Sequence, residues 1–536
     1  MKGENVVKGI QIKNFRSLKD TGIQTLSPIT LLVGENSSGK STFLRAFPLL
    51  KQSISKRTSG PILWAGDVDD YVDFGSFEET ATNDDSSSIT FRFKFDMNCL
   101  GYLYRYMILS RYLDHTENSD VDSIDYEITI SSIKGRDFVS RFKLSLNSIN
   151  FYSDVTEGRL CINDDFVYTE EKEENYDEAV GKNARPVYGF ITASSKAFGF
   201  VLPNIDPLWH DLINTIFSED EDDYKVYRVS EVIVDIGNRL SQNEDLVKIS
   251  DNDERFSDLP SWYSEVYNRI VELITSGAHP RLSEEIKLCY LYRVFSDIDE
   301  YIVNYFKQVH YIAPLRATAE RYYRLRNLAV DEVDYQGKNL AIFINSLTQK
   351  QLREFHLWTS KYFGFTVNTQ KNKGHLSLQI RLVDTNDPIN LSDTGFGYSQ
   401  VLPIITQIWE LSTRKVDHNR SYYQNKGPMP LVVAIEQPEL HLHPAVQAKL
   451  ARAFIACIQL ARDNGFQLQL LLETHSETIV NYLGRAVAKG LLDPDDISVV
   501  LFDKQMQSKI TTVRNSKYDQ NGFLENWPYG FFEAEE

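Results

Sequence analysis

The sequence predicts an α/β protein whose central unit is divided by an insertion, and three observations carry this prediction. Near the N-terminus a buried strand, a glycine-rich loop and a helix follow one another over residues 29–50. Near the C-terminus apolar strands alternate with helices over residues 431–503. Between them lies a run of strand patterns followed by helical patterns, and 536 residues are enough for two or more structural units.

The glycine-rich loop has the spacing of a phosphate-binding P-loop. In "LLVGENSSGKSTFLRAF", residues 31–47, Gly34 is followed by four residues and then by "GKS". Glycines let backbone N–H groups approach a phosphate, and the following helix, expected to end near Pro48, points its positive end at the same place. Lysine supplies a cation and serine a hydroxyl for Mg²⁺. The predicted nucleotide-binding residues are Gly34, Glu35, Asn36, Ser37, Ser38, Gly39, Lys40, Ser41 and Thr42.

Composition limits the classes of function. The formal net charge of −18 disfavours direct contact with nucleic acid or an acidic membrane, so nucleic acid would be met through a partner or a local basic patch. The four cysteines are far apart, which indicates neither a zinc site nor a disulfide framework. The sequence contains no signal peptide pattern and no apolar run of membrane-spanning length. We therefore expect a cytoplasmic protein without a membrane segment.

The order of patterns along the chain predicts three parts. In "SITFRFKFD", residues 88–96, apolar and polar residues alternate as in a half-buried strand, and similar segments continue an antiparallel meander to about residue 163. Acidic stretches at residues 163–183 and 217–225 are expected to be solvated loops. A long amphipathic helix is expected over Ser283–Gln308, with an apolar stripe at Ile286, Leu291, Val294, Ile298 and Ile302. The predicted parts are residues 1–100 with the P-loop, residues 101–304 with the meander and a mainly helical insertion, and residues 305–536.

Two further strands end in residues suited to a nucleotide site. The apolar strand Leu431–Ile435 delivers Glu436 at its C-terminal end, as a Walker B acid that holds Mg²⁺ together with Ser41. One strand later, "LLLETHS" brings in His475, which is a candidate for contact with a γ-phosphate.

Several segments together resemble the ABC-type ATPase heads of the RecF, SMC and OLD class, and specifically compact bacterial AAA family ATPases of the Septu-type and retron-associated defence systems. They are "KNFRSLKD", "GENSSGKST", "HYIAPLRA", "LSDTGFGYSQVLPII", "IEQPELHLHP", "ETHSE" and "WPYGFFEAEE". The resemblance implies an ABC-type P-loop head with ATP and Mg²⁺ as ligands, and a homodimer or higher oligomer.

The resemblance also implies roles for particular residues. Lys40 and Ser41 hold the phosphates and Mg²⁺, Glu436 is the Walker B acid, and His475 is the switch histidine. "LSDTGFGYSQ" resembles the signature motif, in which Ser392, Gly395 and Gly397 cap the γ-phosphate of a second protomer. "HLHP" corresponds to the dimer-contact loop, and a metal site at its two histidines, His441 and His443, is disfavoured because no further ligands cluster there. Arg316 in "APLRA" is a candidate sensor of nucleotide or partner.

One position departs from the pattern of the ABC-type heads. Gln437 stands where these proteins commonly place the glutamate that acts as hydrolytic base, and glutamine is a poor proton acceptor. Either Glu439 substitutes for it, or hydrolysis is slow and ATP chiefly holds two heads together. The Q-loop glutamine has two candidate locations, Gln52 and the segment Asp73–Phe77.

The sequence therefore predicts an ATP hydrolase head that dimerises around nucleotide and regulates an effector. The predicted effector is a separate nuclease that acts in anti-phage defence. The alternative is a RecF-like repair ATPase that binds DNA itself, which salt-dependent DNA binding would favour. A small-molecule P-loop kinase is disfavoured because it needs neither the signature-like segment nor the Thr-His strand end.

Overall fold

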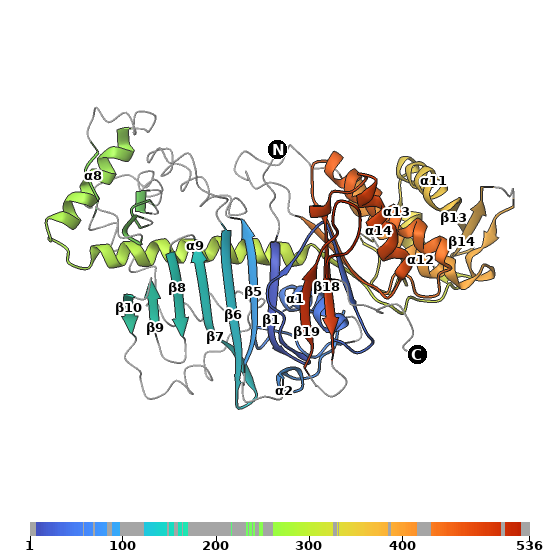
Figure 1. The fold of residues 1–536 in the computed structure, drawn as a ribbon. Coiled ribbons are helices and arrows are strands. Elements are labelled where there is room, and N and C mark those ends of the chain that lie inside the picture. Colours follow the sequence, from blue (N-terminus) through green and yellow to red (C-terminus); the bar gives the residue numbers. More distant parts are fainter. Residues whose placement is uncertain are drawn as a thin grey trace.

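The computed structural model describes residues 7–526 apart from residues 57, 68–69, 83–87, 97–122, 147–148, 155–158, 163–164, 170–215, 217–231, 234, 238, 242–245, 250–260, 325–329, 331, 384–386, 415–429 and 505–509. Its described strands form an antiparallel sheet and a mainly parallel sheet that lie side by side, with a small third sheet at one end (Figure 1). The predicted α/β head with an antiparallel meander and a helical insertion is thus confirmed. No helix in the described part of the chain is long and apolar enough to cross a membrane.

The antiparallel sheet contains the predicted meander. Its strands lie in the order β10-β9-β8-β7-β6-β5-β1-β2, and β3 pairs with β1. Their bounds are β1 (Val7–Phe15), β2 (Leu18–Asp20), β3 (Gln24–Thr25), β5 (Ser88–Asp96), β6 (Ser123–Ile133), β7 (Arg136–Leu146), β8 (Ile149–Asp154), β9 (Arg159–Ile162) and β10 (Asp165–Thr169). The prediction of a loop over residues 163–183 is therefore wrong near its start, where β10 pairs with β9. Residues 217–225 lie outside the described residues.

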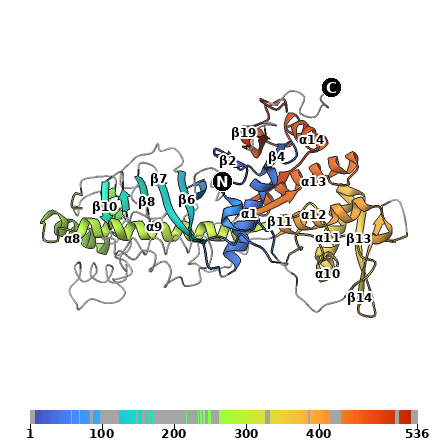
Figure 2. The ribbon, with the colours of Figure 1, turned by 90° about the horizontal axis from the view of Figure 1, so that it is seen from below.

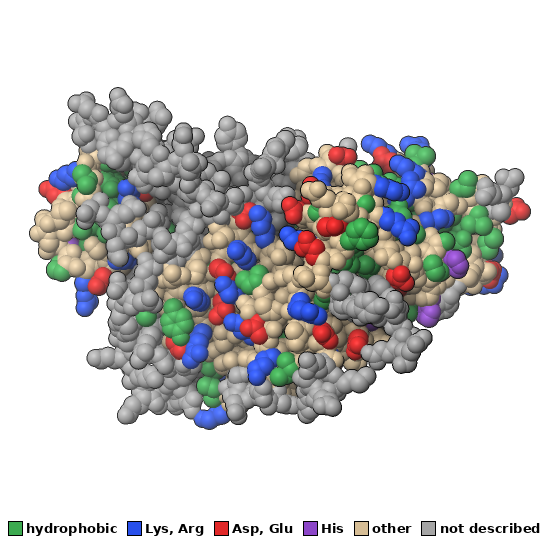
Figure 3. Space-filling model, viewed as in Figure 1, with side chains coloured by type: hydrophobic (Ala, Val, Ile, Leu, Met, Phe, Trp, Pro, Cys, Tyr) green, Lys and Arg blue, Asp and Glu red, His purple; other side chains and the backbone are tan. Residues whose placement is uncertain are grey.

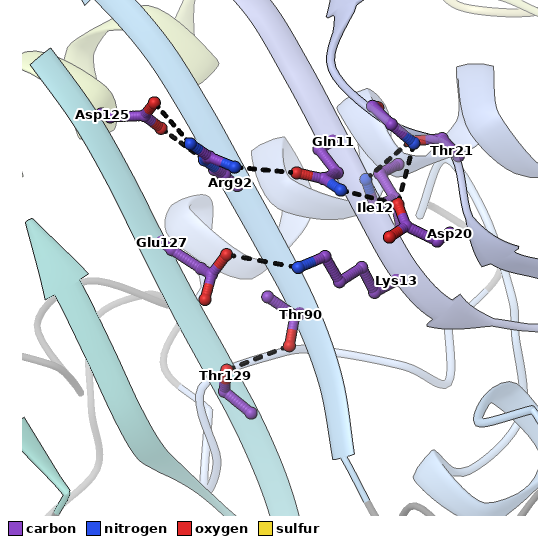
Figure 4. Close-up of polar contacts among 11 residues, drawn as sticks. Gln11, Ile12, Lys13, Asp20, Thr21, Thr90, Arg92, Asp125, Glu127 and Thr129 are labelled. Atoms are coloured by element: carbon purple, nitrogen blue, oxygen red, sulfur yellow. Dashed lines mark hydrogen bonds and ion pairs between the residues drawn. The ribbon is translucent and has the colours of Figure 1, made fainter. Parts of the chain in front are cut away.

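The two faces of this sheet differ in chemistry. The apolar residues of β5 are buried on one face, where Phe93 packs against Phe306 of the long helix α9 (Leu282–Lys307), which runs along this face of the sheet (Figure 2). The opposite face carries ion pairs between neighbouring strands, including Arg92 with Asp125 (Figure 4). This alternation follows directly from the two-residue period of a strand.

The parallel sheet forms the head and has both faces covered. Its order is β11-β16-β17-β4-β18-β19, in which only β19 is antiparallel to its neighbour. Residues of one strand point alternately into two cores: Leu32 faces the core shared with the antiparallel sheet, whereas Leu31 faces the core on the other side. The strands are β4 (Ile29–Gly34), β11 (Val309–Ile312), β16 (Leu431–Glu436), β17 (Leu468–Glu473), β18 (Ile497–Asp503) and β19 (Thr512–Ser516).

Helices separate into two layers around the parallel sheet. Helix α1 (Lys40–Ser55) lies between this sheet and α9, whereas α12 (Phe396–Thr413), α13 (Pro444–Asp463) and α14 (Glu477–Ala488) line the opposite side. The third sheet and its two helices pack beyond α12 and α13, and α8 packs on the first half of α9. The bounds are β12 (Tyr323–Arg324), β13 (Phe365–Asn372), β14 (His375–Leu382), β15 (Ile389–Asn390), α2 (Phe77–Thr80), α8 (Ser261–Thr275), α10 (Leu340–Ser346) and α11 (Gln349–Phe363), with 3-10 turns η3 (Leu391–Asp393) and η4 (Pro494–Asp496).

Helix α1 does not end near Pro48 as predicted, but continues to Ser55. A proline inside a helix removes one backbone hydrogen bond. Here Phe47, Pro48 and Leu49 are all buried between the sheets, so tertiary packing holds the helix together across that gap.

The long insertion helix agrees with its prediction, because Ile286, Val294, Ile298 and Ile302 of the expected stripe are buried; the side chain of Leu291 lies outside the described set.

The predicted boundary at residue 100 separates β5 from β6, which pair directly in one sheet. The meander and the first part of the head thus share a single sheet.

Candidate functional site

The P-loop begins where the central strand β4 ends, and its two glycines are required by different contacts. A Cβ atom on Gly34 would lie 2.3 Å from the backbone oxygen of Phe502, so the neighbouring strand β18 leaves no room for a side chain. Gly39 has a φ of 96°, in the left-handed region, at the residue that starts α1. Gly34 therefore lets the strands approach, and Gly39 allows the turn into the helix.

The loop forms one wall of a polar pocket of about 300 Å³ at the C-terminal ends of the parallel strands. Lys40 reaches back across its own loop, and its Nζ donates to the carbonyl oxygens of Gly34 at 2.9 Å and Glu35 at 2.5 Å. Burial lowers the pKa of Lys40, and the nearby carboxylates of Glu473, Glu439 and Glu35 partly oppose this. The lining residues are Ser17, residues 36–42, Gln437, Glu473 and His475.

Ser41, the predicted ligand of Mg²⁺, contacts a carboxylate that the sequence did not single out. Its hydroxyl donates to Oε1 of Glu473 at 2.8 Å, at the end of β17. Glu473 is 2% exposed, and its Oε2 is buried with no hydrogen-bond partner among the described residues. Like Glu436, Glu473 follows an apolar strand, which is the signal that could have identified it.

The predicted Walker B acid, Glu436, lies on the same side of the sheet but contacts a different residue of α1. Arg45 donates to it twice, from Nε to Oε1 and from Nη2 to Oε2, each at 2.7 Å. The hydroxyl of Tyr311 also donates to Oε1 at 2.7 Å. This network raises the pKa of Arg45, chiefly through the hydrogen bonds to Glu436.

The strand register explains how two acids reach one helix. Glu436 and Glu473 are directly paired across β16 and β17, so both side chains point toward α1. Ser41 and Arg45 lie four residues apart on that helix and therefore face the sheet together. Burial raises the pKa of Glu473 to about 7, and the neighbouring charge of Glu436 adds to the shift.

Comparison with known proteins assigns this P-loop chain to a family. The AAA ATPase domain family matches residues 6–480, which is most of the sequence.

The chain belongs to the AAA ATPase domain family.

Two solved structures are similar to it over almost their whole length. One is an SMC head bound to the C-winged helix domain of ScpA, and the other is the SMC head domain from Thermotoga maritima. Each is 11% identical with a TM-score of 0.32, and the match covers 95% of this chain and 97% and 98% of theirs, respectively. None of the curated proteins matches the sequence significantly.

In this AAA ATPase, an arginine binds the backbone of the turn after β16. Gln437 has a φ of 43°, a conformation that is unusual for a residue other than glycine and that concentrates at functional sites. Arg316 donates from Nη2 to the carbonyl oxygens of Glu436 at 2.9 Å and Gln437 at 3.3 Å. Arg316 is buried, which lowers its pKa to about 10. In this structure the predicted sensor therefore positions the turn that presents Gln437.

Glu439 links the turn after β16 to the turn after β17. Its two carboxylate oxygens accept from the hydroxyl of Thr474 at 2.9 Å and from the backbone N–H of His475 at 2.6 Å. Such contacts suit a positioning residue better than a hydrolytic base. The imidazole of His475 lines the pocket, and burial together with the charge of Lys40 lowers its pKa to about 4. His475 is therefore neutral near pH 7 and can donate or accept a hydrogen bond.

The signature-like segment is not brought to the P-loop within one chain. Ser392 lies in η3, where its hydroxyl and N–H both donate to Oδ1 of Asn390, and Gly395 starts the 18-residue helix α12. Gly395 is exposed, and a Cβ placed on it would meet no described atom within 4 Å. Gly397 lies closer to the loop after β16, since a Cβ placed on it would be 3.6 Å from the carbonyl oxygen of His441. None of the three residues is among those that line the nucleotide pocket.

The two candidate locations of the Q-loop glutamine make contacts within the fold and do not line the nucleotide pocket. Gln52 donates to the carbonyl oxygens of Leu63 and Val72 and lies outside the pocket lining. In the segment 73–77, Phe74 and Phe77 are buried, and Ser76 caps α2. His443 likewise caps α13, because its Nδ1 accepts from the N–H of Ala445. Among the described residues no group of three His, Cys, Asp or Glu side chains could hold a metal ion.

The pocket nevertheless fits Mg²⁺ delivered with a nucleotide. This cation takes few ligands from protein and keeps water and phosphate oxygens for the rest. The hydroxyl of Ser41 and the unpartnered buried oxygen of Glu473 are hard oxygen donors of the required kind. Bound Mg²⁺ would neutralise part of the negative charge of the phosphates, and Lys40 would neutralise another part.

Proposed function

We propose that this AAA ATPase binds Mg²⁺ and ATP in the P-loop pocket, dimerises around two nucleotides, and thereby regulates a partner effector, a separate nuclease in anti-phage defence. One observation carries the dimer: the P-loop pocket and the signature-like segment belong to the same chain but lie apart in it. In a dimer, Ser392 and Gly395 of one copy cover the phosphates held by Lys40 of the other. The exposure of Gly395 at the start of α12 supports this arrangement, because a helix N-terminus favours an anion.

The nature of the partner is proposed from charge and from the resemblance to defence ATPases. A net charge of −18 favours a basic partner, such as a nuclease that itself contacts nucleic acid. Lysine and arginine side chains also gather over the part of the head that contains α13 (Figure 3). This local patch is where nucleic acid or an acidic segment of a partner would meet the head.

Nucleotide-dependent dimerisation tests the first part of the proposal. With a non-hydrolysable ATP analogue and Mg²⁺, light scattering should show wild-type protein shifting from monomer to dimer. S392R should bind the analogue as a monomer, whereas K40A should not bind it. S276R, which changes an exposed residue between α8 and α9, is the matched control and should dimerise. If S392R dimerises as readily as S276R, the signature-like segment is not the contact.

Purification from the native host with Mg²⁺ and ATP tests the second part. The proposal expects a nuclease, identified by mass spectrometry, that is lost from K40A preparations. Bare DNA in place of a protein partner would instead select the RecF-like alternative. Direct DNA binding by the isolated protein, weakening steeply between 50 and 200 mM salt as is typical of phosphate contacts, would also support that alternative.

A further inference from the structure

Two acids end neighbouring strands of the head, and their contacts differ. Glu436 and Glu473 are paired in register and both face α1, and both are almost fully buried. Only Glu473 lies among the pocket residues and contacts Ser41, the hydroxyl that the P-loop offers to a metal. Glu436 is displaced toward the next turn of α1, at Arg45.

Every side-chain oxygen of Glu436 is already in use. Oε1 accepts from both Arg45 and Tyr311, and Oε2 accepts from Arg45. For this carboxylate to bind a metal, a bidentate ion pair would have to break and Arg45 would lose its partner. Breaking a buried pair by removing one partner is costly, because a charge is left uncompensated.

Glu473 has the opposite arrangement. Its Oε1 accepts one hydrogen bond, from Ser41, and its Oε2 is buried with no partner in the described part of the chain. A buried carboxylate oxygen without a donor is unusual in a folded protein. A cation supplied with the nucleotide would satisfy that oxygen, and Ser41 beside it is a second hard oxygen.

We propose that Glu473, rather than Glu436, is the protein carboxylate that holds Mg²⁺ beside Ser41, and that Glu436 positions α1 through Arg45. The assignment rests on the proposed function in that the cation arrives with ATP in this pocket. It transfers the acidic role from Glu436 at the end of β16 to Glu473 at the end of β17. Glu473 then neutralises one charge of the metal, and Lys40 remains available to the phosphates.

Nucleotide affinity measured with and without the metal tests the assignment. A fluorescent, non-hydrolysable ATP analogue is titrated into wild type, E473Q and E436Q, first in EDTA and then in Mg²⁺. In wild type we expect Mg²⁺ to strengthen binding. In E473Q the gain in affinity on adding Mg²⁺ should be at least tenfold smaller than in wild type, since changes around a metal site typically lower metal affinity 10- to 100-fold. E436Q should retain the gain, and S41A should lose part of it.

Direct metal binding gives a second readout. Mn²⁺ replaces Mg²⁺, and its affinity for the protein–analogue complex is followed by electron paramagnetic resonance. E473Q should weaken Mn²⁺ binding by the same factor while leaving affinity in EDTA within twofold of wild type. A cooperative thermal transition of E473Q in EDTA, with a melting temperature no lower than that of wild type, shows that the variant is folded.

The outcomes separate the assignment from the function on which it rests. A gain lost by E436Q and kept by E473Q, or lost equally by both, overturns the assignment while leaving ATP binding in place. Wild-type protein that binds the analogue in neither condition overturns the proposed function and the assignment with it.

Discussion

The ends of β16 and β17 are alike in sequence and different in chemistry. Each is an apolar strand that finishes with a buried glutamate, and the two glutamates are neighbours in one ladder. At β16 the acid is neutralised by Arg45 and shares its hydrogen bonds with Tyr311. At β17 a serine hydroxyl is the only direct hydrogen-bond partner of the carboxylate among the residues that the structure describes. A buried carboxylate that is paired with a cation is costly to unpair, whereas one without a cation is available for a ligand.

Removal of the cation at β16 should have the largest effect on stability. R45M leaves Glu436 buried and unpaired, so the free energy of unfolding should fall by about 3–4 kcal/mol. Denaturant titration at pH 7 measures the change. R321M is the control, because the exposed pair of Arg321 and Asp393 should contribute under about 1 kcal/mol. Equal losses in the two variants would mean that Glu436 is not held by Arg45.

The acid at β17 should make stability depend on pH. The pKa of Glu473 is raised from 4.5 to about 7 in the folded protein, so folding favours its protonated form. Its contribution is fully favourable below about pH 4.5 and is lost as the pH rises through 7. The difference in unfolding free energy between wild type and E473Q should change by about 3 kcal/mol over this range. Denaturation in EDTA, without nucleotide, measures it; parallel pH profiles for the two proteins would contradict the prediction.

A second acid at β16 should affect turnover rather than stability. Gln437 lines the pocket but is a poor proton acceptor, so Q437E should release phosphate from ATP roughly a hundredfold faster than wild type. E439Q, which changes an acid whose oxygens are both engaged, is the comparison. If wild type and Q437E turn over at the same rate, the account of a slow switch that ATP holds closed loses its basis.

The smallest expected effect lies at the hydroxyl that supports Glu436. Y311F removes one hydrogen bond to a buried carboxylate and should lower the unfolding free energy by about 1.5 kcal/mol. Y305F removes a bond between the buried Tyr305 hydroxyl and the neutral amide oxygen of Gln469, and should cost about 1 kcal/mol. A larger loss for Y305F than for Y311F would show that Glu436 depends little on its third hydrogen bond.

Local patterns were sufficient for most of the fold. The alternation in "SITFRFKFD" predicted β5, and the apolar runs before Glu436 and His475 predicted β16 and β17, because side-chain period and burial are properties of a short segment. The same local rule failed at Pro48, where packing on both sides of α1 outweighed the missing hydrogen bond. The loop expected over residues 163–183 failed similarly at residues 165–169, since pairing with β9 makes that segment a strand.

The sequence by itself determined that the chain has a P-loop between a strand and a helix, and which residues end the neighbouring strands. Glycine spacing and apolar runs specify these features without reference to distant residues. Only the tertiary structure decided that Ser41 meets Glu473 and that Arg45 meets Glu436. These partners are separated by 432 and 391 positions, and they meet because β16 and β17 pair in a register that places two acids one helical turn apart along α1.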